Sequence, residues 1–230
     1  MVGTGLILSE LKKEIEKYLG TPYARNYWQE GRLIKEAVFG GKGDWEQIEY
    51  ATRCAAEKEG LNYDQLGVDD KRQLQKNYRI GIDCSGLTYH LLDRLDKVNG
   101  GGGILYKMVG VTKDWGQLGV RVVSAADQTN SLNSVAVGSV SEAKTGDLIR
   151  HNKGTHVLMV VENLGDRLVY VHSSNGTKVN GVHYGEIVIT NSGKPLNEQK
   201  WSDETKNSDN YADLFYPDSG DGIFRPKFLG

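Results

Sequence analysis

The chain has 230 residues, a net charge of −2 at neutral pH and ordinary fractions of hydrophobic (38%) and charged (25%) side chains. These values indicate a globular protein with one large domain or two small ones, and they exclude the basic footprint of a nucleic-acid-binding protein. No apolar run is long enough to span a membrane, and the N-terminus lacks the basic region of a signal peptide. Two cysteines, Cys54 and Cys84, are too few for a disulfide framework.

The first predicted helix covers residues 9–20. Ser9 is expected to cap it, and Gly20 with Pro22 just beyond is expected to end it. The residue before a proline is extended, so Tyr23 follows in an extended segment from which its hydroxyl could reach a site. Ordinary packing is the alternative role of this tyrosine.

Residues 26–78 are predicted to be helical, with no visible chemistry. Three helices are expected, at 30–39, from an Asp44 cap to Gly60, and at 69–78. Cys54 lies among alanines in the second helix and is predicted to belong to the core.

The next helix begins at Cys84. Asp83 is expected to cap it, and Cys84 heads an apolar stripe that continues through Leu87, Leu91 and Leu95. A thiol at a helix N-terminus faces unpaired N–H groups and the positive end of the dipole, which favours the thiolate. Gly86 leaves room for a substrate backbone. The Asp83 carboxylate opposes ionisation, so a nucleophile here needs a nearby cation, most simply a histidine. The alternative is a buried structural cysteine.

Residues 99–142 form a long, weakly patterned connection. It begins with four consecutive glycines, and these match no phosphate-binding loop because no Lys-Ser/Thr pair follows them. One strand is predicted in it, at 120–124.

From residue 143 the pattern becomes β. The predicted strands lie at 148–150, 156–162, 167–172, 186–190 and 223–228, with a hairpin turn at 163–166. Pro226 suits an edge position in the last of them. The acidic stretch at 203–221 lacks the spacing of an EF-hand calcium loop.

Two histidines of the predicted hairpin, His156 and His172, share one face if the loop length or a bulge allows it. One imidazole would take the thiol proton and the second would orient the first. His151, placed on a turn, is a weaker alternative base, and His90 should point away from Cys84 along the helix. The alternative is that the two histidines are ordinary cross-strand partners without a catalytic role.

Several segments together resemble the NlpC-type cysteine peptidases, a papain-like family of bacterial cell-wall endopeptidases. They are Tyr-Leu-Gly-Thr-Pro-Tyr (18–23), Asp-Cys-Ser-Gly-Leu (83–87), Gly-Asp-Leu-Ile (146–149), Thr-His-Val-Leu-Met-Val-Val (155–161) and Val-His-Ser-Ser (171–174). The resemblance covers under half of the chain. Two segments depart from the family pattern: the insertion at 26–78 and the long connection at 99–142.

The resemblance implies a catalytic trio and its helpers. Cys84 would be the nucleophile, His156 the general base and His172 the orienting residue. Tyr23 would help to hold the oxyanion. Asp83 and Ser85 match positions that in relatives receive the free N-terminus of a peptidoglycan stem peptide.

We therefore expect one α+β domain over residues 1–230, with helices packed on a central antiparallel sheet in a papain-like arrangement. Its expected activity is hydrolysis of γ-D-glutamyl stem-peptide bonds through a thioester, with no metal or organic cofactor. It would act at the cell wall or outside the cell, after export, or after cytoplasmic storage and release. The alternatives are an acyltransferase or a protein-directed effector with the same site, a zinc site made by Cys84, His156 and His172, and a non-catalytic wall-binding module.

Overall fold

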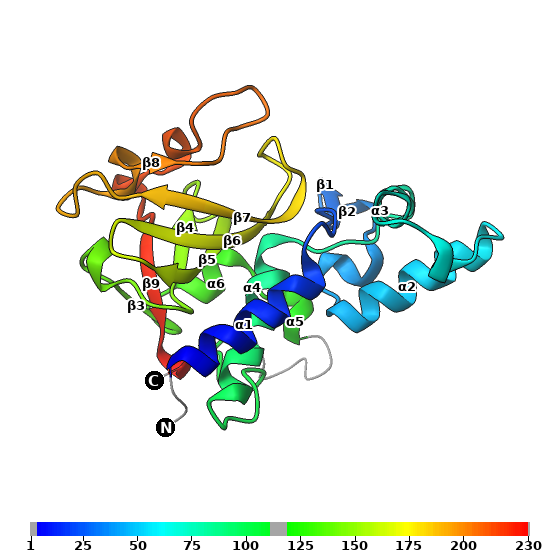
Figure 1. Ribbon diagram of the computed structural model, residues 1–230, viewed down its shortest axis with the longest axis horizontal. Coiled ribbons are helices and arrows are strands. Elements are labelled where there is room, and N and C mark those ends of the chain that lie inside the picture. Colours follow the sequence, from blue (N-terminus) through cyan, green and yellow to red (C-terminus); the bar gives the residue numbers. More distant parts are fainter. Residues whose placement is uncertain (1–3, 111–118, 230) are drawn as a thin grey trace.

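The computed structural model describes residues 4–110 and 119–229, and its centre is a seven-stranded sheet (Figure 1). The strands lie in the order β3-β9-β4-β5-β6-β7-β8, and all neighbouring pairs are antiparallel. Their bounds are β3 (Ser134–Ala136), β4 (Leu148–His151), β5 (His156–Asn163), β6 (Arg167–Ser174), β7 (Gly181–Val188), β8 (Lys200–Trp201) and β9 (Gly222–Pro226). With its helices, the chain is therefore an α+β protein, as predicted.

Helices cover one face of this sheet, and short 3-10 turns cover the other. Helices α1 (Thr4–Tyr18), α4 (Cys84–Val98) and α6 (Ala125–Thr129) lie on the first face (Figure 1). Alternate residues of β5 face the two layers, because side chains alternate along a strand. Val157 and Met159 join the core under α4, whereas Leu158 and Val160 join Trp201 in a second core. Burial on both faces explains why β5 is apolar throughout.

Short 3-10 helices fill the remaining connections. They are Val38–Gly41, Tyr63–Gln65, Val140–Glu142, Leu196–Glu198, Tyr211–Leu214, Pro217–Ser219 and Lys227–Leu229. None of the helices in the described residues combines the length and apolar character needed to cross a membrane.

The insertion at 26–78 is only partly helical, which corrects the prediction. Helices α2 (Trp45–Lys58) and α3 (Val68–Asn77) are present, but the helix predicted at 30–39 is replaced by an antiparallel hairpin of β1 (Tyr27–Gln29) and β2 (Arg32–Lys35). The hairpin turn consists of Glu30 and Gly31, both with positive φ. Two such residues form the turn that matches the twist of paired strands.

Three other local predictions are wrong. The strand predicted at 120–124 overlaps a short helix, α5 (Gly119–Val122), and Ser124 caps α6. Helix α1 begins before Ser9, so Ser9 is not its cap. Cys54 is exposed rather than part of the core.

Strand β9 is an interior strand and not an edge. It pairs with β4 on one side and with β3 on the other. Pro226 is the last residue of β9 and lies past Leu148, the first residue of β4. Its missing N–H therefore interrupts no hydrogen bond between β9 and β4. The sheet edges are instead the short strands β3 and β8.

Candidate active site

Cys84 is the first residue of α4, as predicted. Asp83 precedes it with an extended backbone and caps the helix, because its Oδ1 accepts from the Gly86 N–H at 2.7 Å. The Cys84 side chain is 5% exposed and heads the buried stripe that packs on the sheet. The helix therefore presents the thiol at its N-terminus, against the start of β5.

Gly86 has a different role from the expected one. A Cβ at this position would lie 2.9 Å from the Gly41 carbonyl oxygen and 3.2 Å from the Cα of Lys42. The missing side chain thus allows the insertion backbone, and not a substrate backbone, to approach the helix.

The cation beside Asp83 is a lysine. Lys42 of the insertion places its Nζ 2.8 Å from Asp83 Oδ1 and 2.9 Å from the Val123 carbonyl oxygen, and it also donates to the Ser85 hydroxyl. Lys42, Asp83 and Ser85 are each less than 9% exposed. The Lys42 ammonium thus occupies the position beside Asp83 and Ser85 where the resemblance implied the ammonium of a substrate. A substrate-binding role for Asp83 and Ser85 stays a prediction.

The resting thiol is protonated. Burial, and then the Asp83 carboxylate, raise the pKa of the Cys84 thiol to about 11. The Lys42 ammonium and the backbone N–H groups of Val157 and Ser85 act in the opposite direction but do not outweigh burial. Ionisation of this sulfur at neutral pH therefore requires a base.

His156 and His172 are in direct contact. The distance from His156 Nε2 to His172 Nδ1 is 2.9 Å. When the register of β5 and β6 is continued beyond the pair Met159 and Val171, the two histidines are diagonal neighbours on one face. A bulge between Val160 and Glu162 changes the pairing register in the part of the hairpin nearer the turn. The predicted histidine pair is thus present, diagonal rather than directly opposed.

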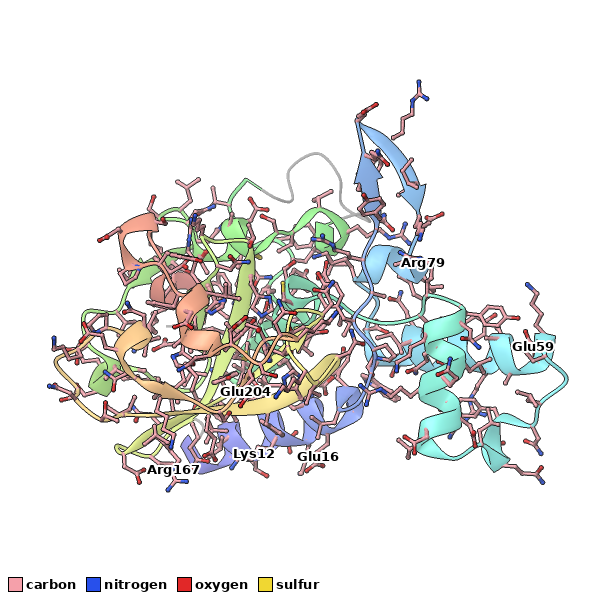
Figure 2. All side chains as sticks on the ribbon, turned by 90° about the horizontal axis from the view of Figure 1, so that it is seen from above. Lys12, Glu16, Glu59, Arg79, Arg167 and Glu204 are labelled. Carbon is pink, nitrogen blue, oxygen red and sulfur yellow. The ribbon has the colours of Figure 1, made fainter. Side chains whose placement is uncertain are left out.

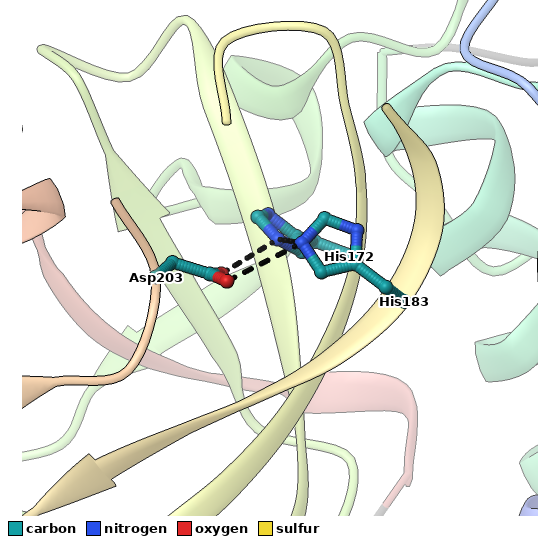
Figure 3. A group of neighbouring side chains, drawn as sticks. All are labelled: His172, His183 and Asp203. Carbon is teal, nitrogen blue, oxygen red and sulfur yellow. Dashed lines mark hydrogen bonds and ion pairs between the residues drawn. The ribbon is translucent and has the colours of Figure 1, made fainter. Parts of the chain in front are cut away.

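The pair continues into two residues that the sequence reasoning did not assign. His183 of β7 lies directly opposite His172, with 2.9 Å between their Nε2 atoms. Asp203, which follows β8, lies 3.1 Å from His172 Nε2 and 3.4 Å from His183 Nε2 (Figure 3). The Tyr170 hydroxyl also donates to Asp203 at 2.7 Å. In the sequence, Asp203 is distinguished only as the first residue of the acidic stretch at 203–221.

The hydrogen-bond partners assign the proton positions along this chain. The Gly181 carbonyl can only accept, so His183 Nδ1 donates to it at 2.9 Å. The Asp203 carboxylate also only accepts, so the His172 tautomer that fits it carries its proton on Nε2. His172 Nδ1 then accepts from His156 Nε2–H. His156 Nδ1 is left with a lone pair, as a general base requires.

The charge of Asp203 favours a proton on His172 Nε2. Burial would raise the pKa of the Asp203 carboxyl, but hydrogen bonds, led by the one from His172, outweigh it and hold the pKa well below its usual range. Burial, reinforced by repulsion from the neighbouring imidazoles, lowers the pKa of His156 well below 6.5. His156 is therefore neutral at pH 7, and the same shift makes it a weaker base than a free imidazole.

The other two histidines of interest lie outside this chain of bonds. His151 is the last residue of β4, not part of a turn; it is fully buried, stacks on Tyr211 and donates to its carbonyl at 3.2 Å. Burial lowers its pKa to about 4. His90 bonds to the Lys42 carbonyl oxygen at 2.9 Å.

A groove of about 370 Å³ opens over His156. Tyr23, Arg25, Ser174 and Tyr211 are among its walls. Burial, and then the neighbouring Cys84 and Asp83, raise the pKa of the Tyr23 hydroxyl. Among the described residues, no hydrogen bond joins the thiol to an imidazole. Such bonds are often long in the absence of substrate and tighten when it binds.

A metal ion could be held by a different trio from the one predicted. The ligand atoms of His172, His183 and Asp203 all lie within 4.8 Å of one another, and no other such group of His, Cys, Asp or Glu is found in residues 4–110 and 119–229. Cys84 and His156 are not part of it. A metal there would take the His172 nitrogen that carries the orienting proton, so the two uses exclude each other.

Comparison of the chain with known protein families, with curated proteins and with solved structures finds no match.

Substitution of Lys42 with methionine is expected to lower the free energy of unfolding by about 3–5 kcal/mol, because it leaves the buried Asp83 carboxylate without a counter-charge. Chemical denaturation measures this value. Adding Asp83→Asn to the variant should recover most of the loss. Lys12→Met, which removes a half-buried surface ion pair with Glu162, should cost less than about 1 kcal/mol. Equal losses in the two lysine variants would contradict the role of Lys42.

Alkylation of Cys84 by iodoacetamide is expected to be slow at pH 7, where about one thiol in ten thousand is ionised if the pKa is about 11. The rate should rise roughly tenfold per pH unit up to about pH 11. Cys54→Ser serves as the background, because Cys54 is exposed and would also react. A rate already at its maximum at pH 7 would show that the resting sulfur is a thiolate.

Proposed function

We propose that the protein is a papain-like cysteine peptidase of the NlpC type that hydrolyses γ-D-glutamyl amide bonds of peptidoglycan stem peptides. The observations that carry this proposal are the chain of hydrogen bonds from His156 through His172 to Asp203, and a thiol at a helix N-terminus that accepts from the backbone N–H of Val157, the residue after His156. These groups are the nucleophile, the base and the orienting residues that the proposed reaction requires. The segment resemblance supplies the substrate class.

In the first half of the reaction, His156 Nδ1 takes the Cys84 proton as the sulfur attacks the scissile carbonyl carbon. The carbonyl oxygen becomes an oxyanion, which backbone N–H groups at the start of α4 and the Tyr23 hydroxyl would stabilise. The protonated His156 then gives its proton to the leaving amine. The C–N bond breaks and a thioester remains on Cys84.

In the second half, His156 takes a proton from water, which attacks the thioester. The carboxylic acid leaves, and the proton returns to the Cys84 sulfur. His172 stabilises the imidazolium that forms in each half, because its Nδ1 accepts from His156 Nε2 and its own proton is held by Asp203. Neither half requires a redox cofactor.

The decisive experiment incubates the protein with a defined γ-D-glutamyl stem peptide and identifies the products by mass spectrometry. Hydrolysis adds one water across the amide bond, whereas transfer to an added amine would identify an acyltransferase with the same site. Intact peptide after incubation with a folded protein would argue against the proposal and in favour of a binding module or a protein-directed effector.

Activity is expected to be unchanged by EDTA, because the proposed reaction uses the Cys84 thiol and the His156 imidazole without a Lewis acid. Kinetic assays before and after chelation test this, with metal analysis of the same samples. Loss of activity with EDTA and its return with zinc would favour the zinc alternative.

A further inference from the structure

A second groove, of about 630 Å³, adjoins the one over His156. The end of α3 and the β1–β2 hairpin form part of its wall, and Arg79 lies between these two elements (Figure 2). The two grooves share Tyr23, Arg25 and Asn175 among their lining residues. A ligand in the larger groove can therefore extend past Tyr23 toward His156.

The larger groove is strongly basic. Its lining includes five cationic side chains and no aspartate or glutamate; the cations are Arg25, Lys35, Lys76, Arg79 and Lys206. In the whole chain acidic residues outnumber Lys and Arg by 30 to 28. The excess of positive charge in this groove is therefore a local feature. Cations along one concave surface attract anions and raise their local concentration.

Within residues 4–110 and 119–229, no carboxylate forms an ion pair with these cations. Arg79 donates to the backbone carbonyls of Glu36 and Arg25, which carry no charge. The ammonium groups of Lys35, Lys76 and Lys206 form no ion pair with a carboxylate among the described residues, and all three lysines are exposed. Elsewhere exposed lysines such as Lys13 and Lys178 do have acidic partners.

We propose that this groove binds the free carboxylates of an anionic peptide substrate while the scissile amide lies at Cys84. This inference rests on the proposed function and adds a specificity to it: the unmodified, carboxylate-bearing peptide is preferred to its amidated form. The volume suits a short peptide segment. A nucleic acid is disfavoured, because a phosphate backbone requires a basic path along the surface and the net charge is −2.

The test compares two stem peptides that differ only in whether the D-glutamyl α-carboxylate and the terminal carboxylate are free or amidated. The wild-type protein is expected to show a KM about tenfold lower for the free acid at low ionic strength, with a similar kcat. A Lys35→Gln, Lys76→Gln, Lys206→Gln variant should lose this preference. The matched control replaces three exposed lysines outside the groove, Lys13, Lys194 and Lys200, and should retain it.

Binding to the Cys84→Ala variant gives a readout that does not depend on catalysis. Calorimetry should show about tenfold tighter binding of the free acid, an effect that 0.5 M NaCl largely removes. If neither peptide is cleaved, the proposed function fails, and this difference in affinity still supports an anion-binding groove. Equal affinities for the two peptides, unchanged selectivity in the groove variant, or displacement of the peptide by a lower concentration of a single-stranded oligonucleotide would each overturn the proposal.

Discussion

Replacement of Cys84 with alanine is expected to abolish hydrolysis of the stem peptide, with a loss of kcat on the order of 10⁴-fold or more. The alanine methyl cannot attack a carbonyl, and the rest of the site cannot form the thioester. The folded structure should survive, because Asp83 still caps α4 and the leucine stripe below is unchanged. Steady-state kinetics measures the loss, and thermal unfolding checks the fold.

The control for this result is the other cysteine. Cys54 lies on the exposed side of α2, so Cys54→Ser should retain wild-type activity. Full activity in Cys84→Ala would remove the nucleophile from the proposal, whatever the histidines do.

The second large effect is expected at Asp203, a residue that touches neither the thiol nor the substrate in the proposed reaction. Asp203→Asn replaces one acceptor oxygen by an N–H donor, which can donate to His172 Nε2. The proton of His172 then moves to Nδ1 and points at His156, whose own proton moves to Nδ1 and faces the thiol. The base is thereby lost, and we expect kcat to fall by about 10³- to 10⁴-fold with a small change in KM.

Two neighbours of Asp203 provide matched controls. Glu204→Gln changes an exposed carboxylate that pairs with Lys178, and it should leave kcat unchanged. Tyr170→Phe removes one hydrogen bond to Asp203 without altering the proton positions, so its effect should be several-fold at most. Nuclear magnetic resonance of the histidine rings reports the tautomers directly. If His172 keeps its proton on Nε2 in Asp203→Asn, the orienting role of Asp203 is wrong.

The centre of the site was predictable from sequence because its signals are local. The Asp83 cap and the stripe beginning at Cys84 follow from spacing within one helix, and the apolar run after His156 marks a strand buried on both faces. The β5–β6 hairpin joins His156 to His172 over a short distance in the chain, and the bulge between Val160 and Glu162 sets the register that puts both on one face.

The outer part of the site could not be predicted in this way. Asp203 lies in a segment without periodicity, and only the position of β8 at the sheet edge brings it to His172. Lys42 follows a glycine-rich turn and reaches Asp83 from 41 residues away. His183 was missed because its strand was predicted at 186–190, whereas β7 begins at Gly181 and places His183 directly opposite His172.

The pKa of the Cys84 thiol could not be predicted from local sequence. The helix dipole and Asp83, which the sequence does reveal, have opposite effects on this pKa, but burial raises it most. Burial depends on packing between α4, the sheet and the insertion, and no single segment specifies it.

The contact between Lys42 and Asp83 also bears on how this chain could be shortened. An insertion that only decorates a fold can be excised and its ends rejoined through a short loop. Here, removal of residues 26–78 would strip the counter-ion from the carboxylate that starts α4 and would also uncover the Gly86 surface of that helix. A minimal version of the protein would therefore need Asp83 recoded together with the deletion.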